Sequence, residues 1–172
     1  MTNKFQYQKD DKYREWVINN LLVTARGIYP TMGRFTTFDI MYLPKPKYDK
    51  NGNDLNNQDH FLEVKARNFN HDKYETTFIE KDKYDAITST TVNSHIPTEL
   101  IVLFEDGFVF FDHNDMITEL VKYSKKYCPD QYDAYEDKWC MKEKEVAELK
   151  INKRNFHKYD KPSPFDSKSE DS

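Results

Sequence analysis

The sequence has little cysteine and no long apolar run, and both absences exclude whole classes of protein. Cys128 and Cys140 are its only two thiols among 172 residues. Two thiols cannot build a disulfide framework or a four-thiolate zinc site. No apolar run approaches the roughly 18 residues that cross a bilayer, and the start of the chain lacks the short apolar core of a secretion signal. We therefore expect a soluble, cytoplasmic protein with no membrane partner.

Glycine is also scarce, with four residues in the whole chain. The phosphate-binding pattern G-x-x-x-x-G-K-[ST] does not occur, and so few glycines disfavour a dinucleotide site. We therefore expect no nucleotide cofactor. The histidines show no pair at metal-ligand spacing and no nucleophile signature, so surface loops are their favoured location; they are His60, His71, His95, His113 and His157.

Aromatic residues are plentiful, and they supply the material for a core. Twelve Tyr, twelve Phe and two Trp argue against general disorder, although 33% of the residues are charged. The length fits one domain of ordinary size. We assign residues 1–161 to a single domain and residues 162–172, which have little to bury, to a disordered polar tail.

Charge is unevenly distributed along the chain, although the net charge is only −4. Residues 105–137 hold nine acids and three lysines, whereas residues 138–161 hold eight bases and four acids. Such blocks are commonly two solvated faces. The sharper interpretation is that residues 138–161 form a basic arm that contacts the phosphates of a nucleic acid.

Hydrophobic periodicity predicts a mixed α/β domain with a central sheet. Apolar residues recur at helical spacing in three segments and alternate in four others. The expected helices are residues 10–25, 78–90 and 114–127. The expected strands are residues 33–44, 60–69, 99–113 (two strands joined at Asp106-Gly107) and 145–152. Asn51-Gly52 is the strongest hairpin signal, and it would pair the first two of these strands.

The segment Glu63-Val64-Lys65 is the strongest candidate for a catalytic site in the sequence. Residues two apart in a strand share a face, so Glu63 and Lys65 stand side by side while Val64 points into the core. If the predicted hairpin forms, Asp39 on the preceding strand converges on Glu63. Two close carboxylates repel unless a cation lies between them, and oxygen ligands favour Mg²⁺ or Mn²⁺. Lys65 could then orient or deprotonate a water and neutralise charge in the transition state.

An ordinary surface Glu-Lys pair is the competing interpretation, and such pairs are common. One further feature favours a site. In the helix after the motif strand, Lys83 lies on the apolar stripe, where a charge is costly without a partner such as a carboxylate or phosphate. Glu80 could also approach the site. Arg67 and Lys73, which follow the motif strand, could contact phosphates or be solvated loop charges.

With these residues in this order, residues 10–111 resemble the PD-(D/E)xK nuclease superfamily. The resemblance implies a restriction-endonuclease-like αβββαβ core, here with a C-terminal helix and strand extension. It implies that Asp39 and Glu63 hold Mg²⁺, with Mn²⁺ as substitute, and that Lys65 and Lys83 assist hydrolysis of DNA phosphodiester bonds. Some members add an acid from the first helix, where Glu15 stands. Phe38 replaces the proline before the aspartate, which weakens the motif without breaking it.

Three functions are compatible with these observations. The first is a Mg²⁺-dependent deoxyribonuclease, endo- or exonucleolytic, with a homodimer allowed. The second is a catalytically silent member of the same fold that binds nucleic acid or protein. The third is an unrelated α/β protein in which E-V-K is coincidental. The small domain and the Lys- and Asn-rich composition would suit a phage protein acting in the bacterial cytoplasm.

Overall fold

The computed structural model describes residues 4–30 and 38–165 of the chain. Its helices are α1 (Lys4–Asn20), α2 (Lys81–Ser94) and α3 (His113–Thr118), with a 3-10 turn at His71–Lys73. Its strands are β1 (Gly27–Pro30), β2 (Ile40–Leu43), β3 (His60–Ala66), β4 (Thr76–Glu80), β5 (Thr98–Phe104), β6 (Gly107–Phe111), β7 (Leu120–Asp133), β8 (Lys138–Lys150) and β9 (Phe156–Lys158). None of the described helices is long and apolar enough to cross a membrane.

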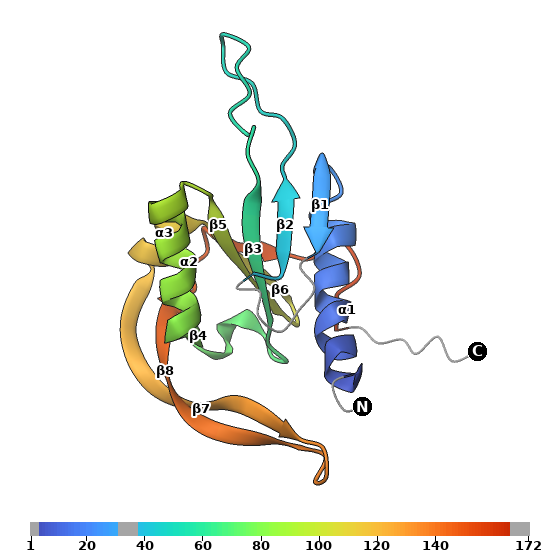
Figure 1. Ribbon diagram of the computed structural model, residues 1–172, viewed down its shortest axis with the longest axis vertical. Coiled ribbons are helices and arrows are strands. Elements are labelled where there is room, and N and C mark those ends of the chain that lie inside the picture. Colours follow the sequence, from blue (N-terminus) through green and yellow to red (C-terminus); the bar gives the residue numbers. More distant parts are fainter. Residues whose placement is uncertain (1–3, 31–37, 166–172) are drawn as a thin grey trace, which may run out of the picture.

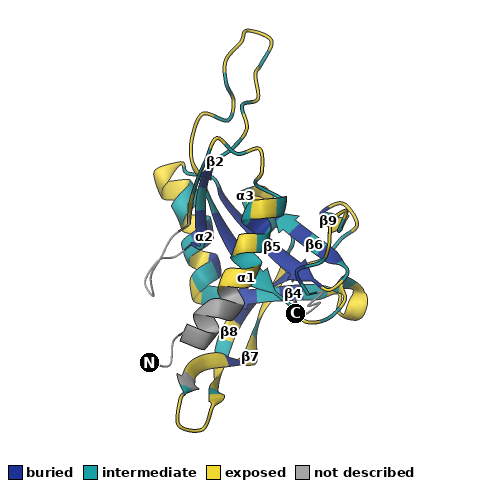
Figure 2. Cartoon of the chain, turned by 90° about the vertical axis from the view of Figure 1, so that its right-hand side faces the viewer, coloured by how far each residue is buried: buried dark blue, intermediate teal, exposed yellow. Residues whose placement is uncertain are grey.

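Six strands form the central sheet, in the order β1-β2-β3-β5-β6-β9 (Figure 1). β3 and β5 run parallel, joined through β4 and α2, and the other neighbours are antiparallel. The order α1-β1-β2-β3-α2-β5 gives the predicted αβββαβ core of a mixed sheet flanked by helices, so the predicted fold class is confirmed. Every residue of β5 is buried, as expected for a parallel strand covered on both faces (Figure 2).

The two faces of the sheet bury different residues. On one face Leu62 and Val64 of β3 pack with Val17 of α1. On the other face the core is built on Ile79, Ile87 of α2, and side chains of β5 and β6. Glu63 and Lys65 alternate with Leu62 and Val64, so they point to the second face, beneath α2.

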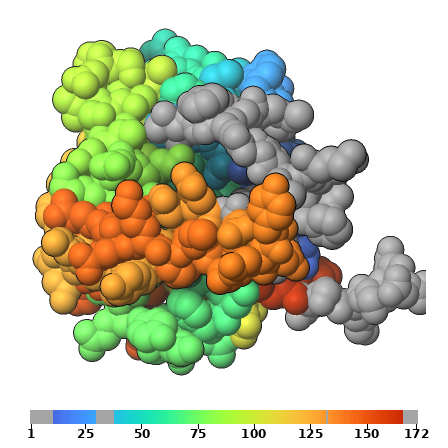
Figure 3. All heavy atoms as spheres, turned by 60° about the horizontal axis from the view of Figure 1, so that its bottom comes forward, coloured from blue at the N-terminus to red at the C-terminus, as the bar shows by residue number. Residues whose placement is uncertain are grey.

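A second sheet, in the order β4-β8-β7, adds to that face. β4 pairs antiparallel with β8, and Ala147 and Leu149 of β8 join the core beside Ile79. β7 and β8 pair with each other over their whole length and form a two-stranded ribbon, residues 120–150. Beyond the part that β4 anchors, the ribbon curves away from α2 and under the molecule (Figure 1). Figure 3 shows this ribbon, in orange, as a band across one face.

The ribbon corrects the prediction for the C-terminal part. The expected helix over residues 114–127 was wrong beyond Thr118, because residues 120–133 form β7. Twelve residue pairs tie β7 to β8, a partner that lies further along the chain and that local periodicity does not reveal. The expected helix-and-strand extension is therefore a short helix, a long ribbon and β9.

Other boundaries also shifted. The helix expected at 78–90 begins at Lys81, because residues 76–80 pair with β8 as β4. The helix expected at 10–25 ends at Asn20. Of the strand expected at 33–44, residues 33–37 lie outside the described residues and residues 40–43 form β2. The hairpin prediction is confirmed: β2 pairs antiparallel with β3, Ile40 opposite Leu62, and Gly52 adopts a φ of 82° in the projecting connection.

The start of the predicted polar tail packs on α1. Trp16 Nε1 donates to the Pro162 carbonyl at 2.9 Å, and the Phe165 ring lies 5.1 Å from that of Tyr13. Residues 162–165 therefore contact α1, and the disorder expected of residues 162–172 as a whole stays a prediction. Residues 166–172 lie outside the described residues.

Candidate active site

Asp39 lies where β2 meets β3, and its side chain extends the pairing of those strands. The Asp39 N–H donates to the Leu62 carbonyl at 3.1 Å, and Asp39 Oδ2 accepts the Val64 N–H at 2.8 Å. The carboxylate thus takes the place of a main-chain acceptor at the beginning of β2. This bond holds the carboxylate beside the motif strand, where its charge influences both Glu63 and Lys65.

Glu63 is buried, with 2% of its side chain exposed, and it lies between two ammonium groups. Its Oε1 lies 3.0 Å from Lys65 Nζ, and its Oε2 lies 3.2 Å from Lys83 Nζ. Oε2 accepts no hydrogen bond of acceptable geometry in the described part of the chain. Burial raises the pKa of Glu63, and the Asp39 carboxylate adds to the rise, against the two lysines, which lower it.

Lys65 is held as a cation. Burial by itself lowers the pKa of this ammonium, but the adjacent Glu63 carboxylate and then Asp39 outweigh it, so the pKa of Lys65 is raised. The structure places Lys65 beside Glu63 and Lys83 toward a carboxylate, as predicted. Their roles in catalysis stay a prediction.

The first helix contributes a base rather than an acid. Arg14 lies one turn before the buried Val17, on the side of α1 that packs on the sheet, and its Nε lies 2.9 Å from Asp39 Oδ1. Glu15, the next residue, is exposed and does not line the cavity at this site. A cation one turn from the apolar stripe was the sequence signal that could have identified Arg14.

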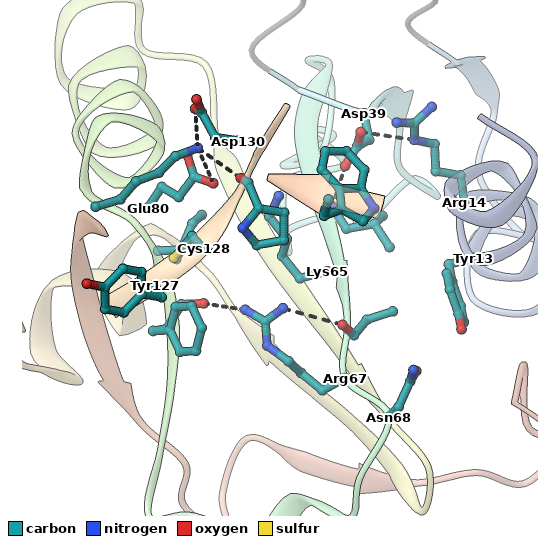
Figure 4. Close-up of a pocket in the computed structure, with 17 residues that line it drawn as sticks. Tyr13, Arg14, Asp39, Lys65, Arg67, Asn68, Glu80, Tyr127, Cys128 and Asp130 are labelled. Atoms are coloured by element: carbon teal, nitrogen blue, oxygen red, sulfur yellow. Dashed lines mark hydrogen bonds and ion pairs between the residues drawn. The ribbon is translucent and has the colours of Figure 1, made fainter. Parts of the chain in front are cut away.

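Arg14, Asp39 and Lys65 border a cavity of about 580 Å³ between β3 and the ribbon (Figure 4). The central sheet side supplies Asp39, Lys65 and Arg67, and α1 supplies Tyr13 and Arg14. The ribbon side supplies residues from β7 and β8, and β4 supplies three more. The lining residues from these last elements are Phe78, Ile79, Glu80, Tyr127, Cys128, Pro129, Asp130, Trp139 and Lys144.

Within the cavity, Glu80 and Lys144 fix the ribbon to the end of β4. Lys144 Nζ lies 3.4 Å from Glu80 Oε1 and 3.3 Å from Asp130 Oδ1, and it donates to the Pro129 carbonyl at 3.0 Å. Glu80 therefore does approach the site, and it does so as a partner of the ribbon. Cys128 is buried at the cavity wall, where burial raises the pKa of its thiol.

The two histidines near the motif strand lie elsewhere and bind carboxylates. His60 Nδ1 lies 2.7 Å from Glu99 Oε1, and His71 Nδ1 lies 2.6 Å from Asp106 Oδ2. Neither lines the cavity. His71, Asp72 and Asp106 have ligand atoms within 4.8 Å of one another, a second place where a cation could bind.

The basic segment 138–161 is less free than its composition indicates. Arg154 lies 3.1 Å from Asp115 and 2.8 Å from Glu119, and Lys144 binds Glu80 and Asp130. Lys150 and Lys153 are exposed. Whether this segment contacts nucleic acid stays a prediction.

No protein-family model matches the sequence, and no curated protein matches it. Among solved structures, the chain is similar to Hjc, a Holliday junction resolvase from the archaeal hyperthermophile Archaeoglobus fulgidus. The two share 12% sequence identity, over 83% of this chain and 89% of that chain, with a TM-score of 0.43.

Proposed function

We propose that this protein is a metal-dependent nuclease that hydrolyses DNA phosphodiester bonds. One observation carries the proposal: Asp39, Glu63 and Lys65, on two paired strands, gather at a cavity that Lys65 and Asp39 line. Two acids and a lysine in a concave, partly desolvated site form a recurrent arrangement for hydrolysis of phosphodiesters.

The donor set fits a hard divalent cation. Glu63 Oε2 is buried and accepts no hydrogen bond among the described residues, and the nearby Asp39 carboxylate makes the charge of Glu63 costlier. Asp39 and Glu63 would be the ligands of Mg²⁺ or Mn²⁺. When bound, such an ion would supply positive charge that polarises the phosphate and acidifies a water. Glu15 is exposed outside the cavity, and we leave it out of this ligand set.

Lys65 would act as a fixed positive charge. Its raised pKa keeps it protonated at neutral pH, which favours stabilising a phosphorane-like transition state over removing a proton from water. Lys83 holds the second oxygen of Glu63 at 3.2 Å and would orient that carboxylate. Arg14 would do the same for Asp39.

A cleavage assay tests the proposal. Linear, nicked, branched and single-stranded DNA are incubated with the protein and Mg²⁺, Mn²⁺ or a chelator, with Asp39→Asn and Lys50→Gln beside the parent. Lys50 is exposed in the β2–β3 connection and does not line the cavity, so Lys50→Gln is the control for a surface substitution. We expect cleavage only with divalent ions, lost in Asp39→Asn and retained in Lys50→Gln. Cleavage at the same rate in chelator contradicts the metal-dependent mechanism.

A catalytically silent nucleic-acid-binding module is the second candidate, and one observation favours it. Arg14, Lys65 and Lys83 already neutralise Asp39 and Glu63, so the cluster is stable as an ion-pair network without an added ion. Inactivity on every DNA form together with measurable DNA binding supports this candidate over the nuclease.

A further inference from the structure

Arg67 stands apart from the other cations near the site. Arg14, Lys65, Lys83 and Lys144 each have a carboxylate oxygen within 4.0 Å. Among the described residues, no carboxylate lies that close to Arg67, although its side chain lines the cavity. A largely buried guanidinium without a counter-charge is unfavourable, and an anionic ligand would relieve it.

The guanidinium of Arg67 is held in place by neutral groups. Nη2 donates to the Phe78 carbonyl at 2.6 Å, while Nη1 makes a long contact of 3.4 Å with the Ala66 carbonyl. Nε is buried and has no partner in the described part of the chain. The Phe78 ring lies 4.7 Å from the guanidinium carbon, so the guanidinium packs on this ring of β4. These contacts fix the position of the Arg67 guanidinium. Some of its N–H groups, chiefly those on Nη1, can still donate hydrogen bonds to a ligand.

Arg67 extends the row of charged side chains that Glu63 and Lys65 begin on one face of β3. Its N–H donates to the Leu103 carbonyl at 2.8 Å, so the extended backbone persists past Ala66. Residues two apart share a face at a spacing of about 7 Å, so Arg67 follows Lys65 on the cavity side. A nucleic-acid strand with one phosphate at Lys65 would bring a neighbouring phosphate to Arg67.

The ribbon limits what can reach this position. Tyr127 and Asp130 of β7 lie across the cavity from β3 (Figure 4), and Pro129 also lines it. The volume of about 580 Å³ lies within the roughly 300–1,000 Å³ of small-ligand sites. One or two nucleotides are ligands of that size.

The charge of the ribbon tip also disfavours a duplex. Residues 129–137 contain four acids and no base, namely Asp130, Asp133, Glu136 and Asp137. Asp130 is paired with Lys144 and Glu136 with Lys138. Asp133, which does not line the cavity, would repel the phosphates of a second strand. At the rim, Tyr127 is 71% exposed and offers its ring to an unstacked base. Cations combined with exposed aromatic rings are typical of single-strand sites.

We infer that the cavity binds an unpaired strand of nucleic acid, with Arg67 holding one phosphate and Tyr127 stacking on a base. The inference rests on the proposed function, whose substrate class it narrows. Single-stranded DNA, or an unpaired stretch within a larger DNA, is the substrate that reaches Lys65.

Binding in chelator tests the inference apart from catalysis. Fluorescence anisotropy over a series of salt concentrations compares a labelled single strand with a matched duplex, for the parent, Arg67→Gln and the control Lys50→Gln. Loss of one phosphate contact on a single strand lowers the slope of log affinity against log salt by about 0.7. We expect that change in Arg67→Gln with the single strand only. A slope equal to that of Lys50→Gln, or equal weakening of duplex binding, overturns the inference.

Tyr127→Ala provides the second measurement, because the side chain is exposed and we expect its removal to change the stability of the fold little. Loss of one stacked base weakens single-strand binding by about 5- to 150-fold with little change in salt slope. Unchanged single-strand affinity in this variant overturns the inference, even where Arg67→Gln fails to fold. Neither measurement uses a divalent ion or hydrolysis, so failure of the proposed nuclease activity leaves both readable.

Discussion

Replacing Lys65 with methionine separates a catalytic lysine from a structural ion pair. Lys65 Nζ lies 3.0 Å from Glu63 Oε1, and the Glu63 side chain is 2% exposed. Methionine keeps most of the side-chain length and removes the ammonium group, with its charge and its hydrogen-bond donors. Lys83 remains 3.2 Å from the other oxygen, so Glu63 keeps one neutralising partner.

The structure sets the size of each effect. Losing a well-placed electrostatic stabiliser lowers turnover on the order of 10²–10³-fold, roughly 2.7–4 kcal/mol of barrier. Losing one charged hydrogen bond to a buried carboxylate lowers the free energy of unfolding by about 1.5–3 kcal/mol. For a chain of this length that is a fall in Tm of roughly 3–12 °C. Mn²⁺ affinity should persist or rise, because one cation competing for the two carboxylates is gone.

Single-turnover cleavage and thermal unfolding, each measured with and without Mn²⁺, provide the assay. Lys65→Met is compared with the parent and with Lys83→Met, which removes the other ammonium from the same carboxylate. We expect Mn²⁺ to raise the Tm of Lys65→Met at least as much as that of the parent, since an ion bound only by the folded state stabilises it. A Lys65→Met protein that cleaves DNA as fast as the parent refutes the assignment of the active site.

Three further outcomes are expected. Asp39→Asn should lose Mn²⁺ affinity in calorimetric titration, because it removes the charge of one proposed ligand, and an unchanged Kd would exclude Asp39 as a ligand. The raised pKa of Lys65 contributes stability that is present below its ordinary pKa of 10.5 and is lost as pH rises through the higher folded value. The free energy of unfolding, measured in urea as a function of pH, should therefore fall less steeply above about pH 10.5 for Lys65→Met than for the parent. Equal slopes for the two proteins would contradict this. Gly107→Ala should lower the free energy of unfolding in urea by at least about 1 kcal/mol, because a Cβ there would lie 2.4 Å from the His157 carbonyl oxygen of β9. An unchanged free energy of unfolding would show that β9 can shift to accept the methyl group at no cost in stability.

The sequence by itself determined which residues of the motif strand face each side of the sheet. Leu62 and Val64 had to enter the core, so Glu63 and Lys65 had to share the other face, and the structure has them there. The apolar stripe of α2 likewise placed Lys83 toward that face, where it reaches Glu63. The Asn51-Gly52 turn indicated the β2–β3 pairing, which brings Asp39 to the motif. Each of these inferences depends on local periodicity or on the pairing of two strands that are consecutive in the chain.

The tertiary structure alone decided the surroundings of these residues. Residues 120–133 became a strand because β8 pairs with them, and such a partner is chosen by global packing rather than by local propensity. That ribbon forms one wall of the cavity and brings Tyr127 and Lys144 opposite β3. Arg14 reached Asp39, and Arg67 remained without a counter-charge among the described residues, through contacts between segments distant in the chain. Periodicity specifies the face on which a side chain lies, whereas its partners depend on how separate elements pack together.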